Sequence, residues 1–178
     1  EMVVEGMVFK VDREMVQCAQ MYVDIVRSDK EYMKAKEILV EQRFDLSKVH
    51  PGMFGTADAV LMNDTHLKVY DLKYGRGVVE VENNTQALFY ALGAILALDP
   101  KKKIEHVEMI IVQPRVADPV KRWHVTRSYM AAWAKTLRAA AEATVPEDAP
   151  RYAGTKQCQW CPHKIKCPEI QDLALEKA

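Results

Sequence analysis

Two strand-like runs separated by a very short connection constrain the fold of this chain most strongly. Residues 54–62 read FGTADAVLM and residues 66–74 read HLKVYDLKY, and both have the apolar pattern of β-strands. Asn63 and Asp64 lie between them and are typical of a hairpin turn. We therefore predict that the two runs pair as neighbouring antiparallel strands.

The apolar periodicity on either side of this hairpin predicts the other elements. Helical spacing gives three amphipathic or apolar helices, and period-two or continuous apolar runs give further strands. Asn84 or Thr85 can cap the strongest helix, which Asp99 and Pro100 end. In chain order we predict a helix over 10–28, strands over 35–46, 54–62 and 66–74, a helix over 83–98, a strand over 106–115 and a helix over 128–144.

This order predicts an α/β fold. Three consecutive strands form an antiparallel meander, and the strand after the long helix adds in parallel through a right-handed crossover. Helices then flank a central mixed sheet. With 178 residues, we expect a core over residues 1–150, with an incomplete N-terminus because the chain begins with Glu1, and a cysteine-rich tail over 151–178 packed on that core.

Composition limits the partners. Lys plus Arg and Asp plus Glu each number 25, so the net charge is zero and a nucleic acid would need a local basic patch. No apolar run approaches the roughly 20 residues that span a bilayer, and nothing resembles a secretory signal. Three of the four cysteines lie near the C-terminus, which suits a metal site in a reducing cytoplasm better than a disulfide framework.

Two carboxylates and a lysine on the hairpin are the strongest chemical signal. Because side chains alternate along a strand, Asp71 and Lys73 project from one face, and Asp58 on the partner strand can reach the same face. Two close carboxylates repel unless a divalent cation neutralises them, and such hard ligands suit Mg²⁺ or Mn²⁺. The alternative is a solvated surface ion pair, which is the more common role of an isolated Asp-x-Lys pair.

The following segments add supporting groups. Gln86 and Tyr90 lie four residues apart, so they share one helix face, from which Gln86 can hold Lys73 and Tyr90 can touch a phosphate backbone. Glycines flank Arg76 and permit a close approach to phosphate. Arg115, just past a strand, and Arg122 are the other candidate DNA contacts.

These motifs together resemble a known family. GTADAV, DLKYGRG and NNTQALFY are similar to motifs II, III and the Gln-x-x-x-Tyr motif of the PD-(D/E)XK nucleases, RecB-like branch, in particular a phage- and prophage-borne group catalogued as a domain of unknown function. The resemblance implies a restriction-endonuclease-like core. It also implies metal ligation by Asp58, Asp71 and the Leu72 backbone carbonyl, Lys73 as the catalytic lysine, and Gln86 with Tyr90 as its support.

The function implied is a Mg²⁺-dependent DNA nuclease, an exonuclease of phage recombination or DNA processing in the bacterial cytoplasm. A recombination partner protein would fit this setting, and the oligomeric state is open. The metal-binding His of the family is absent from residues 1–30 and would lie upstream of Glu1. Glu41 and Glu14 are candidate extra ligands, although each also fits an exposed face. The alternative function is a catalytically inactive module that binds nucleic acid or protein.

The C-terminal cysteines form a separate motif. Cys158, Cys161 and Cys167 have C-x2-C-x5-C spacing, a strong metal signal. Zinc could take these thiolates with His163, whereas a 4Fe–4S cluster needs four thiolates. The spacing is similar to that of CRISPR-adaptation and AddB-type nucleases, which favours iron–sulfur in the full-length protein. Cys18 is a candidate fourth ligand, and it also fits a buried core thiol.

Overall fold

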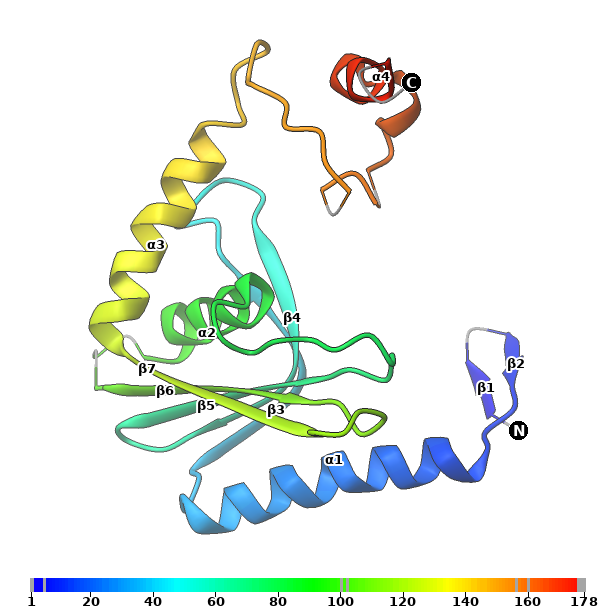
Figure 1. Cartoon of the computed structure of the whole chain (residues 1–178). Coiled ribbons are helices and arrows are strands. Elements are labelled where there is room, and N and C mark those ends of the chain that lie inside the picture. The colour runs from blue at the N-terminus through cyan, green and yellow to red at the C-terminus, as the bar shows by residue number, and fades with distance from the viewer. Residues whose placement is uncertain are drawn as a thin grey trace. The chain divides into compact units, whose positions relative to one another are not determined.

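The computed structural model describes residues 2–4, 6–99, 101, 103–155, 157–159 and 161–175. The chain divides into two compact units, the first ending at Arg138 and the second beginning at Ala139. The first unit contains the sheet and the long helices (Figure 1).

A five-stranded mixed sheet forms the centre of the first unit. Its spatial order is β3-β4-β5-β6-β7, antiparallel throughout except for the parallel pair β5–β6. This confirms the predicted α/β class, with a three-stranded meander and a parallel strand added after a helix. The strands are β3 (Glu37–Asp45), β4 (Phe54–Met62), β5 (His66–Leu72), β6 (His106–Val112) and β7 (Val120–Thr126).

The helices begin where the sequence supplies caps. Asp12 accepts a hydrogen bond from the Met15 N–H, and Asn84 accepts one from the Ala87 N–H, so Asn84 is the cap of the second helix.

Among the described residues, no helix has the length and apolar character needed to cross a membrane. The helices are α1 (Arg13–Tyr32), α2 (Thr85–Leu98), α3 (Arg127–Glu142), the 3-10 turn η1 (Lys164–Lys166) and α4 (Pro168–Leu175).

An edge strand and a short hairpin differ from the sequence prediction. The pattern of apolar residues does not predict β7, because its sequence VKRWHVT mixes charged and apolar residues, yet it pairs with β6 along its whole length. A hairpin of β1 (Met2–Val4) with β2 (Met7–Phe9) also precedes α1. Edge strands tolerate charged side chains because one of their sides lacks a partner strand, so the apolar signal is weak there.

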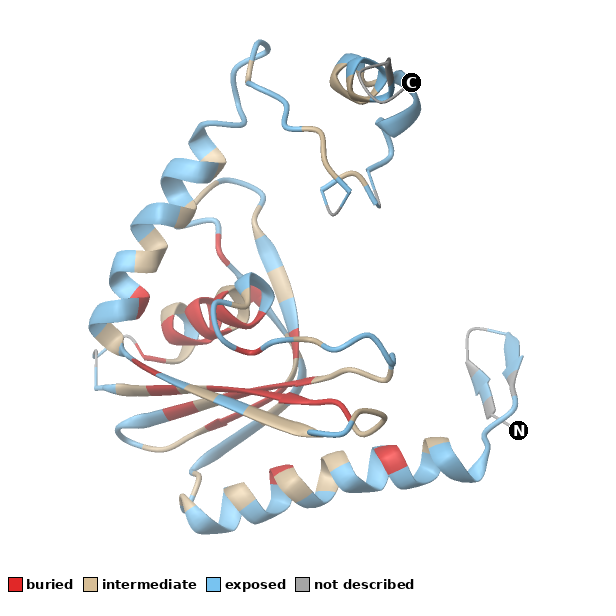
Figure 2. Cartoon of the chain, viewed as in Figure 1, coloured by how far each residue is buried: buried red, intermediate tan, exposed pale blue. Residues whose placement is uncertain are grey.

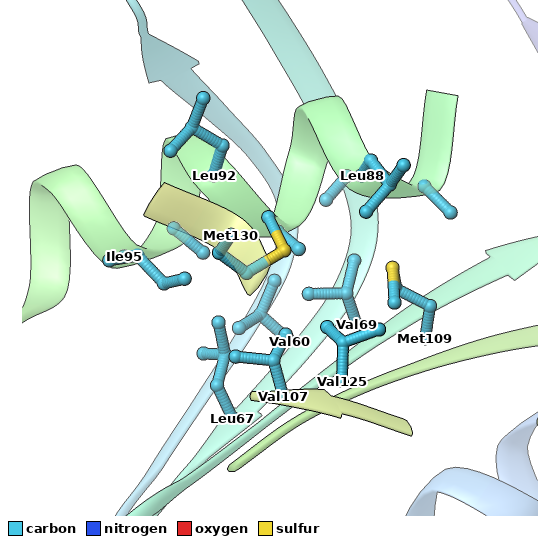
Figure 3. Packing of buried hydrophobic residues seen from close by; sticks show 14 of the residues in the cluster. Val60, Leu67, Val69, Leu88, Leu92, Ile95, Val107, Met109, Val125 and Met130 are labelled. Atoms are coloured by element: carbon cyan, nitrogen blue, oxygen red, sulfur yellow. The ribbon is translucent and has the colours of Figure 1, made fainter. Parts of the chain in front are cut away.

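Apolar layers cover both faces of the sheet (Figure 2). Neighbouring strand residues point to opposite layers, since Val60 joins the cluster beneath α2 while Leu61 joins the cluster that α1 covers. The α2 layer is the larger and takes Met130 from α3 (Figure 3). The α2 helix lies so close to β3 that a Cβ on Gly93 would come 2.7 Å from the Cβ of Phe44. This packing holds the N-terminal turn of α2 over the sheet.

Candidate metal-binding site

Asp58 and Asp71 stand where the ladder between β4 and β5 stops. Regular pairing runs from Met62 with Leu67 to Ala59 with Tyr70, and the two aspartates are the next residues on their strands. Beyond this point the Leu72 N–H donates to Asp58 Oδ2 at 2.7 Å. The Asp58 carboxylate therefore bridges to β5 in place of a backbone carbonyl, and the negative charges of Asp58 and Asp71 interact.

The carboxylate of Asp71 is buried and only partly compensated. Its side chain is 7% exposed, and Lys73 Nζ donates to Oδ1 at 3.0 Å. Lys73 Nζ also lies 2.7 Å from Oδ2, but outside hydrogen-bonding geometry, so this buried oxygen accepts no hydrogen bond from the described part of the chain. Burial raises the pKa of Asp71 and the charge of Asp58 raises it further, while Lys73 opposes both effects without cancelling them.

Lys73 is the first member of a hydrogen-bonded chain that ends on α2. Lys73 Nζ donates to Gln86 Oε1 at 2.9 Å, and Gln86 Nε2 donates to the Tyr90 hydroxyl at 2.8 Å. Gln86 and Tyr90 meet because they are one helical turn apart. The ammonium group is therefore held between a carboxylate of the sheet and an amide of the helix.

Gly55, at the start of the GTAD segment, makes room for this chain. A Cβ at this position would lie 2.9 Å from Cε1 of the Tyr90 ring and 3.0 Å from Cε1 of Phe89. Any larger residue would push the aromatic ring away. The glycine thus allows Tyr90 to lie against β4.

Glu41 interrupts β3 directly opposite Asp58. Val40 pairs with Ala59 and Gln42 pairs with Ala57, so Glu41 faces Asp58 in register but is not bridged to it. Its φ of 49° is in the left-handed region, which costs a non-glycine residue of order 1 kcal/mol and is concentrated at functional sites. The uninterrupted alternation predicted for this strand is therefore wrong at this residue.

Tyr22 on α1 is a member of the site that sequence reasoning missed. Its hydroxyl oxygen is buried and has no hydrogen-bond partner among the residues that the structure describes. Burial raises the pKa of Tyr22, and the charges of Asp58, Asp71 and Glu41 raise it further. Helical spacing places Tyr22 on an apolar helix face, and nothing in that pattern signals three nearby carboxylates.

Gln113 is a second residue that sequence reasoning did not single out. It is 1% exposed and lies just past the end of β6. Its Nε2 donates to the Gly75 and Gly77 carbonyls at 2.9 and 2.7 Å, and its Oε1 accepts from the Val79 N–H at 3.1 Å. One buried amide thereby holds the YGRGV loop that follows Lys73.

The candidate DNA-contacting arginines divide into two groups. Arg115 Nη1 donates to the Tyr74 carbonyl at 3.3 Å, its guanidinium lies over the Tyr74 ring, and its Nε is 3.1 Å from Glu14 Oε1. Arg76 also approaches Glu14, at 3.6 Å, and 70% of its side chain is exposed. Both therefore lie on or beside the loop that Gln113 holds. Arg122 lies on β7 and contacts α1 instead.

Arg122 belongs to an ion-pair network between α1 and the sheet. Its Nη1 donates to Asp29 Oδ2 at 2.8 Å, and the Tyr70 hydroxyl donates to the same oxygen at 2.7 Å. Lys68 Nζ lies 3.4 Å from Asp29 Oδ1 and 2.9 Å from Glu108 Oε2. Burial raises the pKa of Asp29, but the hydrogen bonds from Tyr70 and Arg122 and the nearby positive charges outweigh it, and the pKa is lowered.

Comparison with known sequences shows to which family the chain belongs. The sequence profile of DUF2800, described as a protein family of unknown function, matches residues 6–178. The chain belongs to the DUF2800 family.

Two solved structures resemble this DUF2800 chain distantly. The crystal structure of SSO0001 has a TM-score of 0.38 and 12% identity, over 88% of this chain and 71% of that one. The alkaline exonuclease LHK-Exo from Laribacter hongkongensis has a TM-score of 0.40 and 11% identity, over 75% of this chain and 69% of that one.

The donor chemistry of the DUF2800 site fits a hard divalent cation. Asp58 and Asp71 supply carboxylate oxygens, and one oxygen of buried Asp71 lacks a hydrogen bond. In the described part of the chain, no group of three or more His, Cys, Asp or Glu side chains is arranged to hold a metal. Mg²⁺ is commonly bound through only one or two carboxylates and keeps several waters, so two aspartates satisfy its usual requirement.

The cysteines of the second unit gather at one cavity. Cys158, Cys161, Cys167 and His163 line a hollow of about 470 Å³, and the three thiols are free. The Gly154 N–H lies 3.4 Å from Cys158 Sγ, and Cys167 Sγ lies 3.3 Å from Glu169 Oε2. Cys18 is a buried free thiol on α1 in the first unit.

Proposed function

We propose that this DUF2800 protein is a divalent-metal-dependent DNA nuclease of the PD-(D/E)XK type, RecB-like branch, that acts as an exonuclease. The observation that carries the proposal is the under-compensated carboxylate of Asp71. It is buried beside Asp58, and its one cationic partner, Lys73, is fixed by Gln86. Carboxylates whose pKa values are raised in this way occur preferentially at functional sites.

The carboxylates are the metal-holding part of the proposed site. Asp58 and Asp71 would hold the cation together with the Leu72 carbonyl. Glu41 on the neighbouring strand is a further candidate ligand, although in the described structure the three carboxylates are not already arranged as a ligand group. The bound cation supplies Lewis-acid polarisation of the scissile phosphate. The left-handed backbone of Glu41 supports its role, because strain at a mid-strand residue is retained where function requires it.

Lys73 is the proposed catalytic lysine. Asp71 and Gln86 restrain its ammonium group by hydrogen bonds, so it is already oriented before DNA arrives. From this position it offsets negative charge that develops on the phosphate and orients the attacking water. Tyr90 fixes the amide of Gln86 and therefore acts on Lys73 indirectly.

The path of the DNA backbone runs over the loop after β5 in this proposal. Arg76 is largely exposed there, and Arg115 is stacked on Tyr74 beside it. Guanidinium groups in such positions contact phosphate oxygens without reading bases. Arg122, paired with Asp29, has a stabilising role instead. Mg²⁺ or Mn²⁺ is the expected metal, and phage recombination or DNA processing in the bacterial cytoplasm is the expected setting.

A cleavage assay on wild-type, Lys73→Ala and Lys36→Ala proteins tests the proposal. Lys36 is a matched control, because it forms an exposed ion pair with Asp64 at the β4–β5 turn. With Mg²⁺ or Mn²⁺ we expect linear DNA to be degraded, closed circular DNA to persist, and Lys73→Ala to lose about 100-fold or more of the rate. Lys36→Ala is expected to cut normally.

Two outcomes would contradict this function. Cleavage by Lys73→Ala at the wild-type rate would show that Lys73 takes no part in the chemistry. DNA binding by a wild-type protein that neither cuts nor binds Mn²⁺ would favour the inactive binding module instead. Thermal unfolding of each variant checks that the fold is intact.

The cysteine tail is proposed to hold a second, structural metal. In the described structure the three free thiols and His163 are not arranged as metal ligands, so the proposal rests on their chemistry and on their gathering at one cavity. Three thiols with His163 suit zinc, whereas an iron–sulfur cluster requires a fourth thiolate. Metal analysis of full-length protein purified without oxygen separates the two, since iron with acid-labile sulfide identifies the cluster. Protein free of both metals would refute the proposal.

A further inference from the structure

We propose that Tyr22 is a positioning residue of the metal site, whose hydroxyl fixes the Asp58 carboxylate from the α1 side when a divalent cation is bound. This inference rests on the proposed function. It assigns a role to a helix that none of the recognised sequence motifs includes.

The Tyr22 hydroxyl is a buried donor that none of the described residues pairs with. Buried phenol groups almost always find an acceptor, and a tyrosine with no partner is less stable than phenylalanine in the same place. The Tyr22 hydroxyl is buried and has no partner among the described residues, although carboxylates are close enough to perturb it. An unsatisfied buried donor in a native protein calls for an explanation, and a role at a catalytic or ion-binding site is one such explanation.

Tyr22 packs against the apolar cluster that contains Ala59 and Tyr70, which are the sequence neighbours of Asp58 and Asp71. Among the charged groups that act on Tyr22, Asp58 has the largest effect, followed by Asp71 and Glu41. All three are acceptors, and Tyr22 remains a neutral donor beside them, since burial and these charges hold its pKa above the usual value. It therefore complements a cluster that otherwise consists of negative charge.

The two aspartates are held in different ways. Asp71 receives Lys73, and Asp58 receives the Leu72 N–H at Oδ2. No described side chain donates to Asp58, so a ligand of the proposed cation is oriented by one backbone group alone. Outer partners that orient metal ligands typically contribute 10- to 100-fold to metal affinity. The Tyr22 hydroxyl is the one unused donor buried at this place in the described chain.

Tyr70 supplies a matched control within the same apolar cluster. Its hydroxyl is bonded to Asp29 and plays no part in the proposed site. The experiment is calorimetric titration of Mn²⁺ into wild-type, Tyr22→Phe, Tyr70→Phe and Asp71→Asn proteins at pH 7. We expect Tyr22→Phe to weaken Mn²⁺ binding about 10-fold or more, Tyr70→Phe to bind as the wild type does, and Asp71→Asn to show no binding.

Melting temperatures in EDTA give a second readout. Tyr22→Phe is expected to melt at the wild-type temperature or above it, because the substitution removes an unsatisfied hydroxyl, whereas Tyr70→Phe is expected to melt lower. Wild-type Mn²⁺ affinity in Tyr22→Phe, with binding lost in Asp71→Asn, would overturn the role of Tyr22 and leave the nuclease proposal standing. Equal binding by wild type and Asp71→Asn would overturn both.

Discussion

Asp29 lies on α1 and Asp71 lies on β5 of the sheet, and the surroundings of these two carboxylates shift their pKa values in opposite directions. Asp29 accepts hydrogen bonds from Tyr70 and Arg122 and lies near Lys68, so its pKa is lowered despite burial. Asp71 has Lys73 alone, a second carboxylate beside it and one oxygen without a hydrogen bond, so its pKa is raised.

The tyrosine hydroxyls near these two carboxylates differ in the same way. Tyr70 donates to Asp29, while Tyr22 has no partner beside Asp58 and Asp71. A fully satisfied polar network stabilises the fold, whereas a half-satisfied one destabilises it and persists where a ligand completes it. The difference favours a stabilising role for the Asp29 network and a functional role for the Asp71 cluster.

The largest stability effect should come from Asp29→Asn. The change leaves Arg122 and Lys68 with fewer acceptors in a half-buried place, and because both cations keep Glu108 we expect a loss of about 2 kcal/mol in the free energy of unfolding, below the range for a fully buried pair. Urea unfolding at pH 7 measures it.

The pH dependence of this loss has a defined sign. Since folding lowers the pKa of Asp29, the stability it contributes is present above the ordinary carboxyl pKa and is lost as the pH falls through the lowered value. The difference between wild type and Asp29→Asn should therefore shrink in acid. If the Asp29→Asn protein were as stable as the wild type at pH 7, the contrast between the two carboxylates would not hold.

Gly55→Ala should have the next largest effect. The new methyl group displaces the Tyr90 ring, and overpacking of this kind costs about 1–2 kcal/mol. The displaced ring should also loosen the hydrogen bonds that hold Gln86 and Lys73. We therefore expect the cleavage rate to fall by more than the loss of stability alone would cause. Gly75→Ala is the control for stability, because a Cβ there meets nothing within 4 Å. Unchanged unfolding and cleavage in Gly55→Ala would separate Tyr90 from the site.

Asp71→Asn should give the smallest change, and of the opposite sign to Asp29→Asn. Because folding raises the pKa of Asp71, its ionised form costs stability as the pH rises through that value, so the amide should make the metal-free protein more stable at pH 7. The gain should vanish in acid, where the carboxyl is protonated in both states. Differential scanning calorimetry in EDTA measures it, and a lower melting temperature for Asp71→Asn than for wild type would show that Lys73 compensates Asp71 fully.

Local sequence patterns predicted the secondary structure around the site well. The bounds of β4 agree with the predicted run, and the hairpin turn forms as expected, with Asn63 Oδ1 accepting from the Thr65 and His66 N–H groups. Asn84 caps α2, and the four-residue spacing of Gln86 and Tyr90 brings their side chains into contact. Each of these features depends on neighbours only a few residues away.

Helix and strand periods are local properties of the chain. For that reason the sequence alone predicts the order of the main elements, the meander with its parallel addition, and the face shared by Asp71 and Lys73. Three other features emerged only on folding: Tyr22 packs against the cluster that contains Ala59 and Tyr70, Gln113 holds the YGRGV loop, and Arg122 pairs with Asp29. The energy of a buried polar group depends on the partners that distant segments bring to it, and no periodicity along the chain encodes those partners.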